Sequence, residues 1–553
     1  MKPGVPGGWR AWAGALAVVV AALALVSSAS PEQASSKLRR LPASSLDAGG
    51  LHSCVVLSDG TVRCWGSGAD GELGYRNTKD VGDDEAPGSV GPVDLGTGRK
   101  AVASAAGTAH TCALLDDGTV RCWGSGEHGA LGYGDTVTIG DDESPASVGP
   151  VDLGAGRRAV AITAGSGFTC ALLDNGRVRC WGYGAHGELG YGNTNDLGDD
   201  ETPGSVGPID LGPGRKAVAV SAGGSHACAV LDSGRVRCWG FGLDGELGYG
   251  STNDVGDDET PGSVAAVDLG AGRKAIAISA GESHTCAVLD NGRVRCWGSG
   301  ADGELGYGNT DTIGDDETPG SASYVDLGAG RRALAISAGA HHTCALLDGG
   351  AVRCWGAANA GQLGYGNKDT IGDDETPGGY GPVDLIRPAV AVSAGSDHTC
   401  AVLDNGRVRC WGQGTEGQLG YANTTTIGDN ETPASAGPVV DGGLVAIRLQ
   451  PRLSFVLTPK RDRRWPYRLR ASGKLTGFLA DPATCLGQVG IRATTPRVFA
   501  RVRWVNLKPA ASGCTYAATL TVSGRGSWKV TAAFPGNGSL KGRTAPARRF
   551  RAG

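Results

Sequence analysis

One pattern of apolar and polar positions recurs seven times along this chain. In its second copy, two runs that alternate apolar with polar residues flank Asp-Asp-Gly at 116–118, which predicts a tight β-hairpin with a three-residue loop. That loop places Leu114 opposite Val120 and Cys112 opposite Cys122. Because side chains alternate along a strand, these four share one face, and a disulfide between the two cysteines is geometrically reasonable.

The repeating unit is longer than the hairpin. The first cysteines of successive copies are 58 residues apart as far as Cys344 and 56 apart at the last step. One unit reads as four short strands, at residues 150–153, 159–163, 169–173 and 177–181. The run 159–163 alternates small and branched residues, so we expect it to pack closely on both faces. A small sheet cannot bury both faces alone, and radial repetition solves this problem. The pattern therefore predicts an all-β fold with a seven-bladed β-propeller over residues 46–449.

The ends of the repeat region indicate how the propeller closes. The first unit begins abruptly at Leu46 and lacks the Pro-Val-Asp-Leu run of the others. After the seventh hairpin the chain supplies two further apolar runs, at 438–440 and 444–447. We expect these spare strands to complete a blade begun at the other end, which would remove the open sheet edge.

Residues 1–29 have the pattern of a secretory signal peptide. A basic start precedes an apolar stretch at 11–26, and small residues then offer a cleavage site after Ala29. The alternative is an uncleaved membrane anchor; no other run approaches the ~18 apolar residues that span a bilayer. Residues 30–45 read as an exposed linker. We expect a secreted or cell-surface protein.

The cysteines fit an exported chain. Of the 16 cysteines, 14 form pairs whose members are ten positions apart. The pairs are Cys54 with Cys64, Cys112 with Cys122, Cys170 with Cys180, Cys228 with Cys238, Cys286 with Cys296, Cys344 with Cys354, and Cys400 with Cys410. Metal binding is the rival interpretation, but no pair has two-residue spacing. An even number after an export signal favours disulfides, so we predict one in each hairpin and one between Cys485 and Cys514.

Charge divides the chain into an acidic body and a basic tail. From Gly442 onward there are 21 Lys and Arg against 2 Asp and Glu, a net charge of +19, and the rest of the chain carries −24. Residues 450–553 contain short alternating runs and read as a small β-sandwich, similar to bacterial immunoglobulin-like modules. Its charge suits an anionic cell-surface polymer, and arginine-rich coding bias is the alternative. We expect no nucleic-acid partner for an exported chain, although the charge would suit one.

Several spaced motifs recur in register: His-Thr-Cys-Ala-Leu, Asp-Asn-Gly-Arg-Val, Cys-Trp-Gly and Gly-Glu-Leu-Gly-Tyr-Gly. With them, the repeats resemble the regulator of chromosome condensation family, which implies a seven-bladed β-propeller. The family's founding member activates a nuclear GTPase on chromatin, and no motif here carries that guanine-nucleotide-exchange activity over. The family's cytosolic members lack an export signal and a cysteine pair in every blade. A secreted bacterial inhibitor of β-lactamase with this fold is a closer functional analogue.

Two residue types recur beside each hairpin. A tryptophan follows every second cysteine, and we interpret it as an apolar wedge between blades. A histidine precedes six of the hairpins, at His52, His110, His226, His284, His342 and His398. A ring of histidines suggests a metal site, but Phe168 interrupts it in the third copy. A hydrogen bond from each histidine to the next blade is the simpler interpretation.

An acidic loop also recurs in every unit and reads Gly-Asp-Asp-Glu-Thr-Pro at 198–203 in the third. Its carboxylates, with Asn193 and Asp196 nearby, could hold calcium, although the spacing is not that of a known calcium loop. The alternative is Asx-turn capping on a solvated face. We expect no other cofactor. No Ser/His/Asp set, paired-carboxylate cleft or phosphate-binding loop stands out from the repeats, so we expect no enzymatic activity.

The units differ most directly after their Trp-Gly pair. The residues there are Ser67, Ser125, Tyr183, Phe241, Ser299, Ala357 and Gln413. Neutral variation is one explanation. The other is a protein-binding patch on adjacent blades, formed by Tyr183, His186, Phe241 and Leu243, because exposed aromatic side chains anchor interfaces. These patterns predict an exported, monomeric, non-enzymatic scaffold that binds a protein or a cell surface. The alternative is a secreted protein that inhibits an enzyme.

Overall fold

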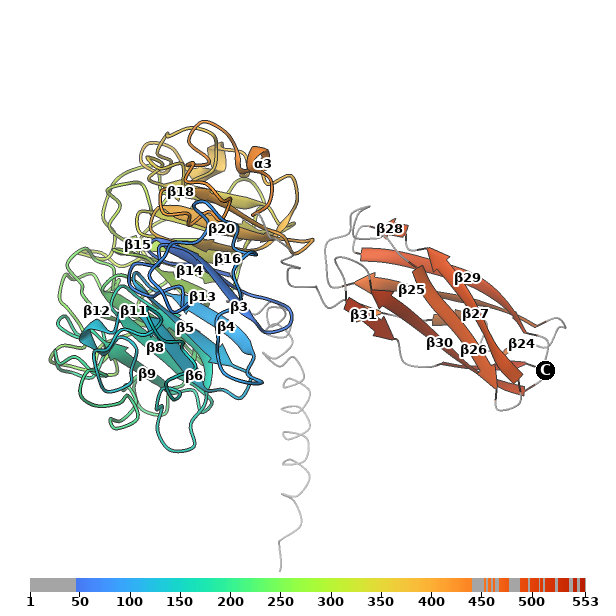
Figure 1. Cartoon of the computed structure of the whole chain (residues 1–553). Helices are drawn as coiled ribbons and strands as arrows, with labels where there is room; N and C mark the ends of the chain where they lie inside the picture. The colour runs from blue at the N-terminus through green and yellow to red at the C-terminus, as the bar shows by residue number, and fades with distance from the viewer. Residues whose placement is uncertain are drawn as a thin grey trace, which may run out of the picture. The chain divides into compact units, whose positions relative to one another are not determined.

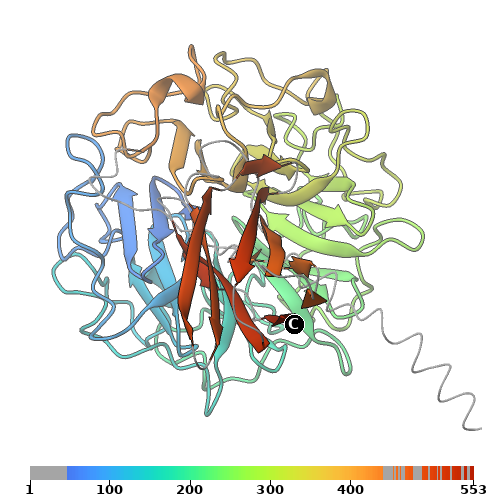
Figure 2. The same cartoon turned by 90° about the vertical axis from the view of Figure 1, so that its right-hand side faces the viewer.

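The computed structural model describes residues 46–439 and, in the C-terminal region, the strands that lie between residues 452 and 552. Residues 46–439 form a ring of seven antiparallel sheets of three strands each (Figures 1 and 2). The blades in chain order are β1 (Leu46–Ala48), β2 (His52–Val56) and β3 (Val62–Gly66); β4 (Ala101–Ala106), β5 (His110–Leu115) and β6 (Val120–Gly124); β7 (Ala159–Ala164), β8 (Phe168–Leu173) and β9 (Val178–Gly182); β10 (Ala217–Ala222), β11 (His226–Leu231) and β12 (Val236–Gly240); β13 (Ala275–Ala280), β14 (His284–Leu289) and β15 (Val294–Gly298); β16 (Ala333–Ala338), β17 (His342–Leu347) and β18 (Val352–Gly356); β19 (Ala389–Ala394), β20 (His398–Leu403) and β21 (Val408–Gly412).

Helices are few and short in the described part of the chain. They are η1 (Glu127–Gly129), η2 (Pro377–Gly379) and α3 (Pro433–Ala436). None of them has the length and apolar character needed to cross a bilayer.

The predicted hairpin is present in every blade. In the second blade Cys112 faces Cys122, as expected. The Leu115 N–H donates to the Thr119 carbonyl at 2.8 Å, which leaves a three-residue loop that ends on Gly118 with a φ of +82°. Glycine adopts this left-handed conformation without steric cost.

A disulfide crosses each hairpin at the predicted rung. The paired cysteines face each other directly across the two strands and are completely buried. The bonds join Cys54 to Cys64, Cys112 to Cys122, Cys170 to Cys180, Cys228 to Cys238, Cys286 to Cys296, Cys344 to Cys354, and Cys400 to Cys410. Disulfides rather than metal-ligating thiolates therefore account for the cysteines of the ring.

The prediction of four strands per blade is wrong. The fourth segment lies beside the third strand, and in the first blade it is joined to that strand by a hydrogen bond from the Val93 N–H to the Val62 carbonyl at 3.0 Å. The proline before Val93 has no N–H to donate. The Asp94 carboxylate then accepts the Gly96 N–H at 2.9 Å, which turns the chain away. Val93 and Leu95 are buried, so the segment covers the core without extending the sheet.

Tryptophan fills the space between neighbouring blades, as predicted. All seven hairpin tryptophans are completely buried. The Trp123 indole N–H donates to the Glu72 carbonyl of the preceding blade at 2.9 Å, and the other six make the same bond. A Cβ on Gly74 would stand 2.9 Å from the Trp123 Nε1. The Gly-Glu-Leu-Gly motif therefore forms a socket for the tryptophan of the next blade.

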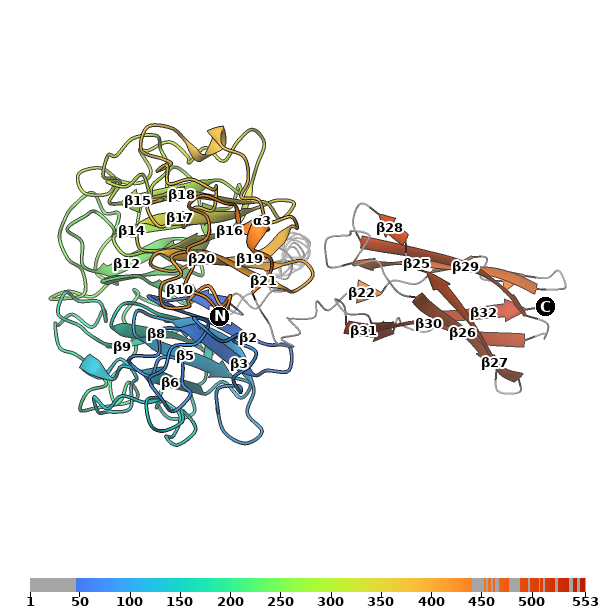
Figure 3. The ribbon, with the colours of Figure 1, turned by 45° about the horizontal axis from the view of Figure 1, so that its top comes forward.

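The inner strands of the blades meet in a closed ring, with the blue first blade next to the orange seventh (Figures 2 and 3). The chain's own start, β1, supplies the inner strand of the first blade, and the Ala48 N–H donates to the Ser393 hydroxyl at 3.0 Å. The Val439 N–H donates to the Val408 carbonyl at 2.9 Å, within the seventh blade. The expectation that residues 438–440 complete the first blade is therefore wrong, and the run 444–447 lies outside the described residues.

A belt of backbone hydrogen bonds joins the inner strands where they end. The Gly50 N–H donates to the Gly107 carbonyl at 3.0 Å, and the Ser396 N–H donates across the closure to the Gly49 carbonyl at 3.1 Å. A Cβ on Gly107 would lie 2.5 Å from the Gly165 carbonyl oxygen, so glycine is required for this approach. We call this side of the ring the glycine end, and the side where the inner strands begin the entry end.

The C-terminal region contains two sheets. One consists of β22 (Arg452–Leu453), β23 (Val456–Thr458), β25 (Tyr467–Thr476), β28 (Lys508–Ala510) and β29 (Gly513–Val522); the other of β24 (Arg461–Asp462), β26 (Gln488–Thr495), β27 (Val498–Asn506), β30 (Gly526–Gly536), β31 (Lys541–Thr544) and β32 (Arg548–Ala552). Cys514 lies in β29, and its predicted partner, Cys485, lies outside the described residues.

Candidate functional site

The candidate protein-binding residues lie on loops that follow the third strands of the third and fourth blades. The Tyr183 N–H donates to the Gly167 carbonyl at 3.0 Å, and the Phe241 N–H donates to the Ser225 carbonyl at 2.9 Å. These bonds tie each loop to the turn between the first two strands of its own blade, at the glycine end. Tyr183 and Phe241 therefore occupy equivalent positions on one face of the ring, one blade apart.

The structure joins these residues into a continuous row. The rings of His128 and Tyr183 meet edge to face with their centroids 4.8 Å apart, and those of His186 and Phe241 do so at 5.0 Å. Tyr183 and His186 connect the two pairs at 6.4 Å. Leu243 follows Phe241 by two positions and is 60% exposed. We call these five residues the aromatic row. The structure brings three of the four predicted residues, Tyr183, His186 and Phe241, into ring contact and adds His128.

Carboxylates of the following blade orient both histidines. His128 Nδ1 lies 2.7 Å from Asp196 Oδ2, and His186 Nδ1 lies 3.5 Å from Asp254 Oδ2. The other oxygen of Asp196 accepts the Gly184 N–H at 2.9 Å, which fixes that carboxylate. The side chains of His128 and His186 remain 50% and 42% exposed, so the row presents oriented rings to solvent.

His128 has an unusual backbone that sets it apart from its equivalents. Its φ is +56°, a left-handed conformation that non-glycine residues rarely adopt. In the third blade, Glu188 Oε2 accepts the His186 N–H at 2.8 Å and holds the loop in a different conformation. The second blade has Ala130 in place of that glutamate, so this restraint is missing there. Backbone strain of this kind is concentrated at functional sites.

Buried glutamates support the loops that carry the row. Glu188 and Glu246 each accept the N–H of the residue two positions earlier through their side chains. Burial raises the pKa of Glu246 to about 8 and raises that of Glu188 above its usual range. Their carbonyls also accept the tryptophan indoles of the next blade. Sequence reasoning missed this role. The recurrence of a glutamate within the Gly-Glu-Leu-Gly motif is the feature that could have indicated it.

Six buried histidines each tie their blade to the next, as predicted, at every junction except that of the third and fourth blades. His226 Nε2 lies 2.7 Å from Thr285 Oγ1, and the Thr285 hydroxyl donates its one proton to the Glu246 carbonyl at 3.0 Å. His226 must therefore carry a proton on Nε2 and donate it to Thr285. Burial lowers the pKa of His226 to about 3, so the ring is neutral. The Nε2 proton is thus engaged between blades, and the ring of histidines serves as a set of blade-to-blade latches.

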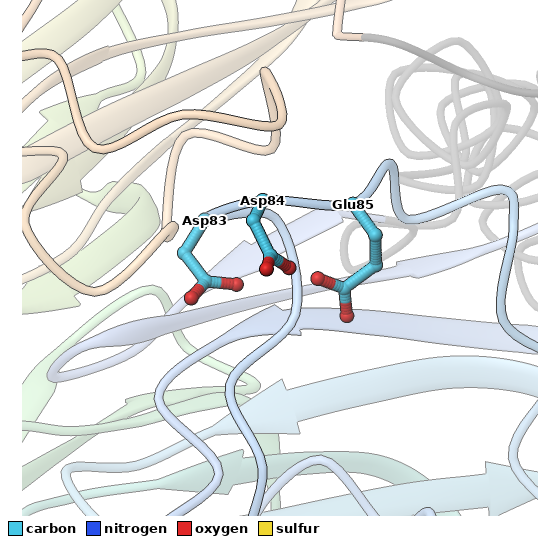
Figure 4. Close-up of side chains that lie close together, drawn as sticks. All are labelled: Asp83, Asp84 and Glu85. Carbon is cyan, nitrogen blue, oxygen red and sulfur yellow. The ribbon is translucent and has the colours of Figure 1, made fainter.

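The acidic loops bring three carboxylates together in each of several blades. In the first blade, Asp83, Asp84 and Glu85 extend from the same side of one loop, and their ligand atoms lie within 4.8 Å of one another (Figure 4). Partial burial, together with a hydrogen bond and like charge from Asp84, raises the pKa of Glu85 to about 7. Such a group offers the oxygen ligands that calcium prefers. Calcium binding at these loops stays a prediction.

Comparison with known proteins identifies the repeats. A family model described as the regulator of chromosome condensation (RCC1) repeat matches residues 43–72, 102–130, 159–188, 217–246, 275–304, 334–362 and 389–418. The ultraviolet-B receptor UVR8 of Arabidopsis thaliana is 33% identical over 377 residues, which cover 59% of this chain and 80% of the receptor.

Solved structures show the same fold. Prp20p from Saccharomyces cerevisiae, studied for its binding to Gsp1p and histones, matches with a TM-score of 0.55 at 20% identity, over 77% of this chain and 92% of that chain. Human WBSCR16 matches with a TM-score of 0.53 at 21% identity, over 65% and 87% of the two chains. With seven matched repeats and seven three-stranded sheets in a ring, this chain belongs to the regulator of chromosome condensation repeat family.

Proposed function

We propose that this chain is an exported, non-enzymatic scaffold that binds a partner protein through the aromatic row. Its relatives include a photoreceptor and a protein studied for its binding to Gsp1p and histones, which supports protein binding as the general role of the fold. Binding a partner on one face of a rigid ring requires no catalytic group, which agrees with a non-enzymatic role.

The observation that carries this proposal is the row itself. Four rings and Leu243 line up across three consecutive blades, while the equivalents of Tyr183 and Phe241 elsewhere are small or polar. Partly exposed aromatic side chains held by their neighbours lose little entropy on binding and dominate interface energetics.

The test is the double variant Tyr183→Ser with Phe241→Ser, which copies Ser125 and Ser299 of neighbouring blades. We expect an unchanged fold and a loss of at least about tenfold in affinity for the protein that the wild-type chain captures from the cell surface. The matched control is Gln413→Ser, at the equivalent position of the seventh blade, which should retain full affinity. Equal capture by the double variant would instead place the site elsewhere.

Inhibition of an enzyme is a special case of the same proposal, since the captured partner would then be that enzyme. An exchange activity on a GTPase would also require this face to hold a GTPase. Both alternatives are decided by the identity of the captured protein and by an assay of its activity with and without the chain.

The proposal extends to export and to the tail. Residues 1–29 would be removed as a signal peptide, and residues 450–553 would form an immunoglobulin-like β-sandwich closed by Cys485 and Cys514. The net charge of +19 from Gly442 onward would hold this domain on an anionic cell-surface polymer. We expect the mature chain to bind isolated cell envelope and to be released as salt rises, because charge attraction is screened. Retention that ignores salt would contradict electrostatic attachment, and a free thiol at Cys485 in non-reducing peptide maps would contradict the disulfide.

A further inference from the structure

The entry end of the ring presents an arc of exposed aliphatic side chains. These are Val102, Val160, Val218, Ile276 and Leu334, which are between 43% and 60% exposed. Each is the second residue of an inner strand and stands where the register to the next strand shifts, so no residue faces it across the sheet. Because the inner strands contact one another around the ring, the five side chains lie in sequence around its entry end. We call them the aliphatic arc.

Two cations precede each residue of the arc, and in four consecutive blades only the first has a carboxylate partner. The paired cations form the ion pairs Arg157–Asp174, Arg215–Asp232, Arg273–Asp290 and Arg331–Asp348. The second cations are Arg158, Lys216, Lys274 and Arg332, which are exposed and have no ion-pair partner among residues 46–439. Their stems pack on the preceding blade: a Cβ on Gly176 would stand 2.8 Å from the Cβ of Lys216.

This arrangement makes the entry end an exception on an acidic body. The chain before Gly442 carries a net charge of −24, yet here four cations without partners stand beside four exposed aliphatic side chains. A polyanion without apolar groups would leave the arc in water, and an uncharged apolar ligand would leave the cations unused. Exposed apolar groups rimmed by charge are typical of binding surfaces.

We infer that the aliphatic arc and its four cations bind an acidic segment of a partner protein whose aliphatic side chains pack on the arc. The arc belongs to the inner strands, so a narrow segment reaches it along the ring axis. A flat membrane would also meet the hairpin turns at this end, which carry Asp174 and its equivalents. The surface is separate from the aromatic row, which lies at the glycine end.

The experiment uses the full chain and short fluorescein-labelled peptides, with binding followed by fluorescence anisotropy. A peptide of alternating Glu and Leu should bind, while Glu–Ser and Lys–Leu peptides should bind at least about tenfold more weakly. Val160→Asp with Val218→Asp should weaken Glu–Leu binding by a similar factor, as should Lys216→Glu with Lys274→Glu. The control Tyr183→Ser with Phe241→Ser should bind the peptide like wild type. Thermal unfolding monitors the fold of each variant.

Three results would overturn the inference. The first is equal binding of the Glu–Ser and Glu–Leu peptides, which would indicate a simple polyanion site. The second is Glu–Leu binding that ignores the Val160 and Val218 substitutions in a folded variant. The third is failure of the Glu–Leu peptide to bind, including the case in which vesicles of phosphatidylglycerol bind and the variants abolish that binding.

Discussion

Residues that meet across blades have changed together in this chain. Phe168 stands where the other six blades have a latch histidine, and the residue that would receive its hydrogen bond in the fourth blade is Ala227, where the other blades have threonine or serine. Losing only one partner would leave a buried polar group unpaired, whereas losing both leaves a dry apolar contact. The junction of the third and fourth blades therefore shows that the fold accepts an apolar pair in place of a latch.

The first prediction concerns the junction of His226 with Thr285. Thr285→Ala alone leaves the His226 Nε2–H buried without an acceptor and should lower the free energy of unfolding by about 1–3 kcal/mol. Adding His226→Phe copies the Phe168 and Ala227 pair and should recover most of that loss. Urea unfolding of the single and double variants measures both values. A double variant no more stable than Thr285→Ala would show that the latch is not a coupled pair.

The same variants predict a change in pH dependence. Burial lowers the pKa of His226 to about 3, whereas an unfolded histidine titrates near 6.5. Between these values the unfolded chain binds the proton and the folded chain does not, so wild type loses stability as the pH falls below about 6.5. The double variant lacks this group and should lose less stability between pH 7 and pH 4. If the free energy of unfolding fell equally with pH in wild type and in the double variant across that range, the lowered pKa of His226 would be contradicted.

The blade is the scale at which the sequence was most informative. Hairpin, disulfide, tryptophan wedge and blade number all follow from local spacing, because each depends on residues within one repeat and its neighbour. The prediction of four strands failed because the fourth segment is limited by a capping aspartate in six units and by a preceding proline in five of the seven. The expectation that the strand at 159–163 packs closely on both faces was also wrong, since Val160 lies at a register shift and is exposed. His128 was missed because its ring position depends on a backbone conformation that Ala130 permits.

A prediction at the level of the blade concerns the loop that precedes the inner strand. Ile386 has a φ of +63° and is 70% exposed, while the equivalent Gly212 has a φ of +99°. A β-branched residue in this conformation is strained, by roughly 1–2 kcal/mol. Ile386→Gly should therefore raise the free energy of unfolding by about 1 kcal/mol, and Gly212→Ile should lower it by at least as much. Chemical denaturation measures both, and a destabilised Ile386→Gly would contradict the argument.

At the scale of the whole molecule, the seventh and first blades differ from every other neighbouring pair. No peptide segment runs directly from one to the other, and the seven described disulfides lie within hairpins. The junction relies on the Ser53 to His398 latch at 2.8 Å and on the Trp65 indole, which donates to the Gln418 carbonyl at 2.9 Å. The other neighbouring pairs have the tryptophan bond and a direct chain connection, and all of them except the third and fourth blades also have a latch.

We therefore expect the loss of a latch to loosen the ring more at the junction of the seventh and first blades than at any other junction. Ser53→Ala and Thr111→Ala each leave one buried histidine without its partner, at a similar local cost of about 1–3 kcal/mol. Only Ser53→Ala should speed hydrogen exchange in both β1 and β19, because only there can the ring open without stretching the chain. Equal protection of these strands in the two variants would show that the closure is no weaker than the other junctions.

The non-covalent closure also means that the position of the seam is arbitrary. All seven inter-blade contacts use the tryptophan socket and six of them also use the histidine latch, so nothing in the packing requires the ring to begin at Leu46. A gene rearranged to start at β4 and to return through the first blade would encode the same ring with the seam one blade further on. Unequal crossing-over within the repeats could move the aromatic row relative to the chain ends without disturbing the fold.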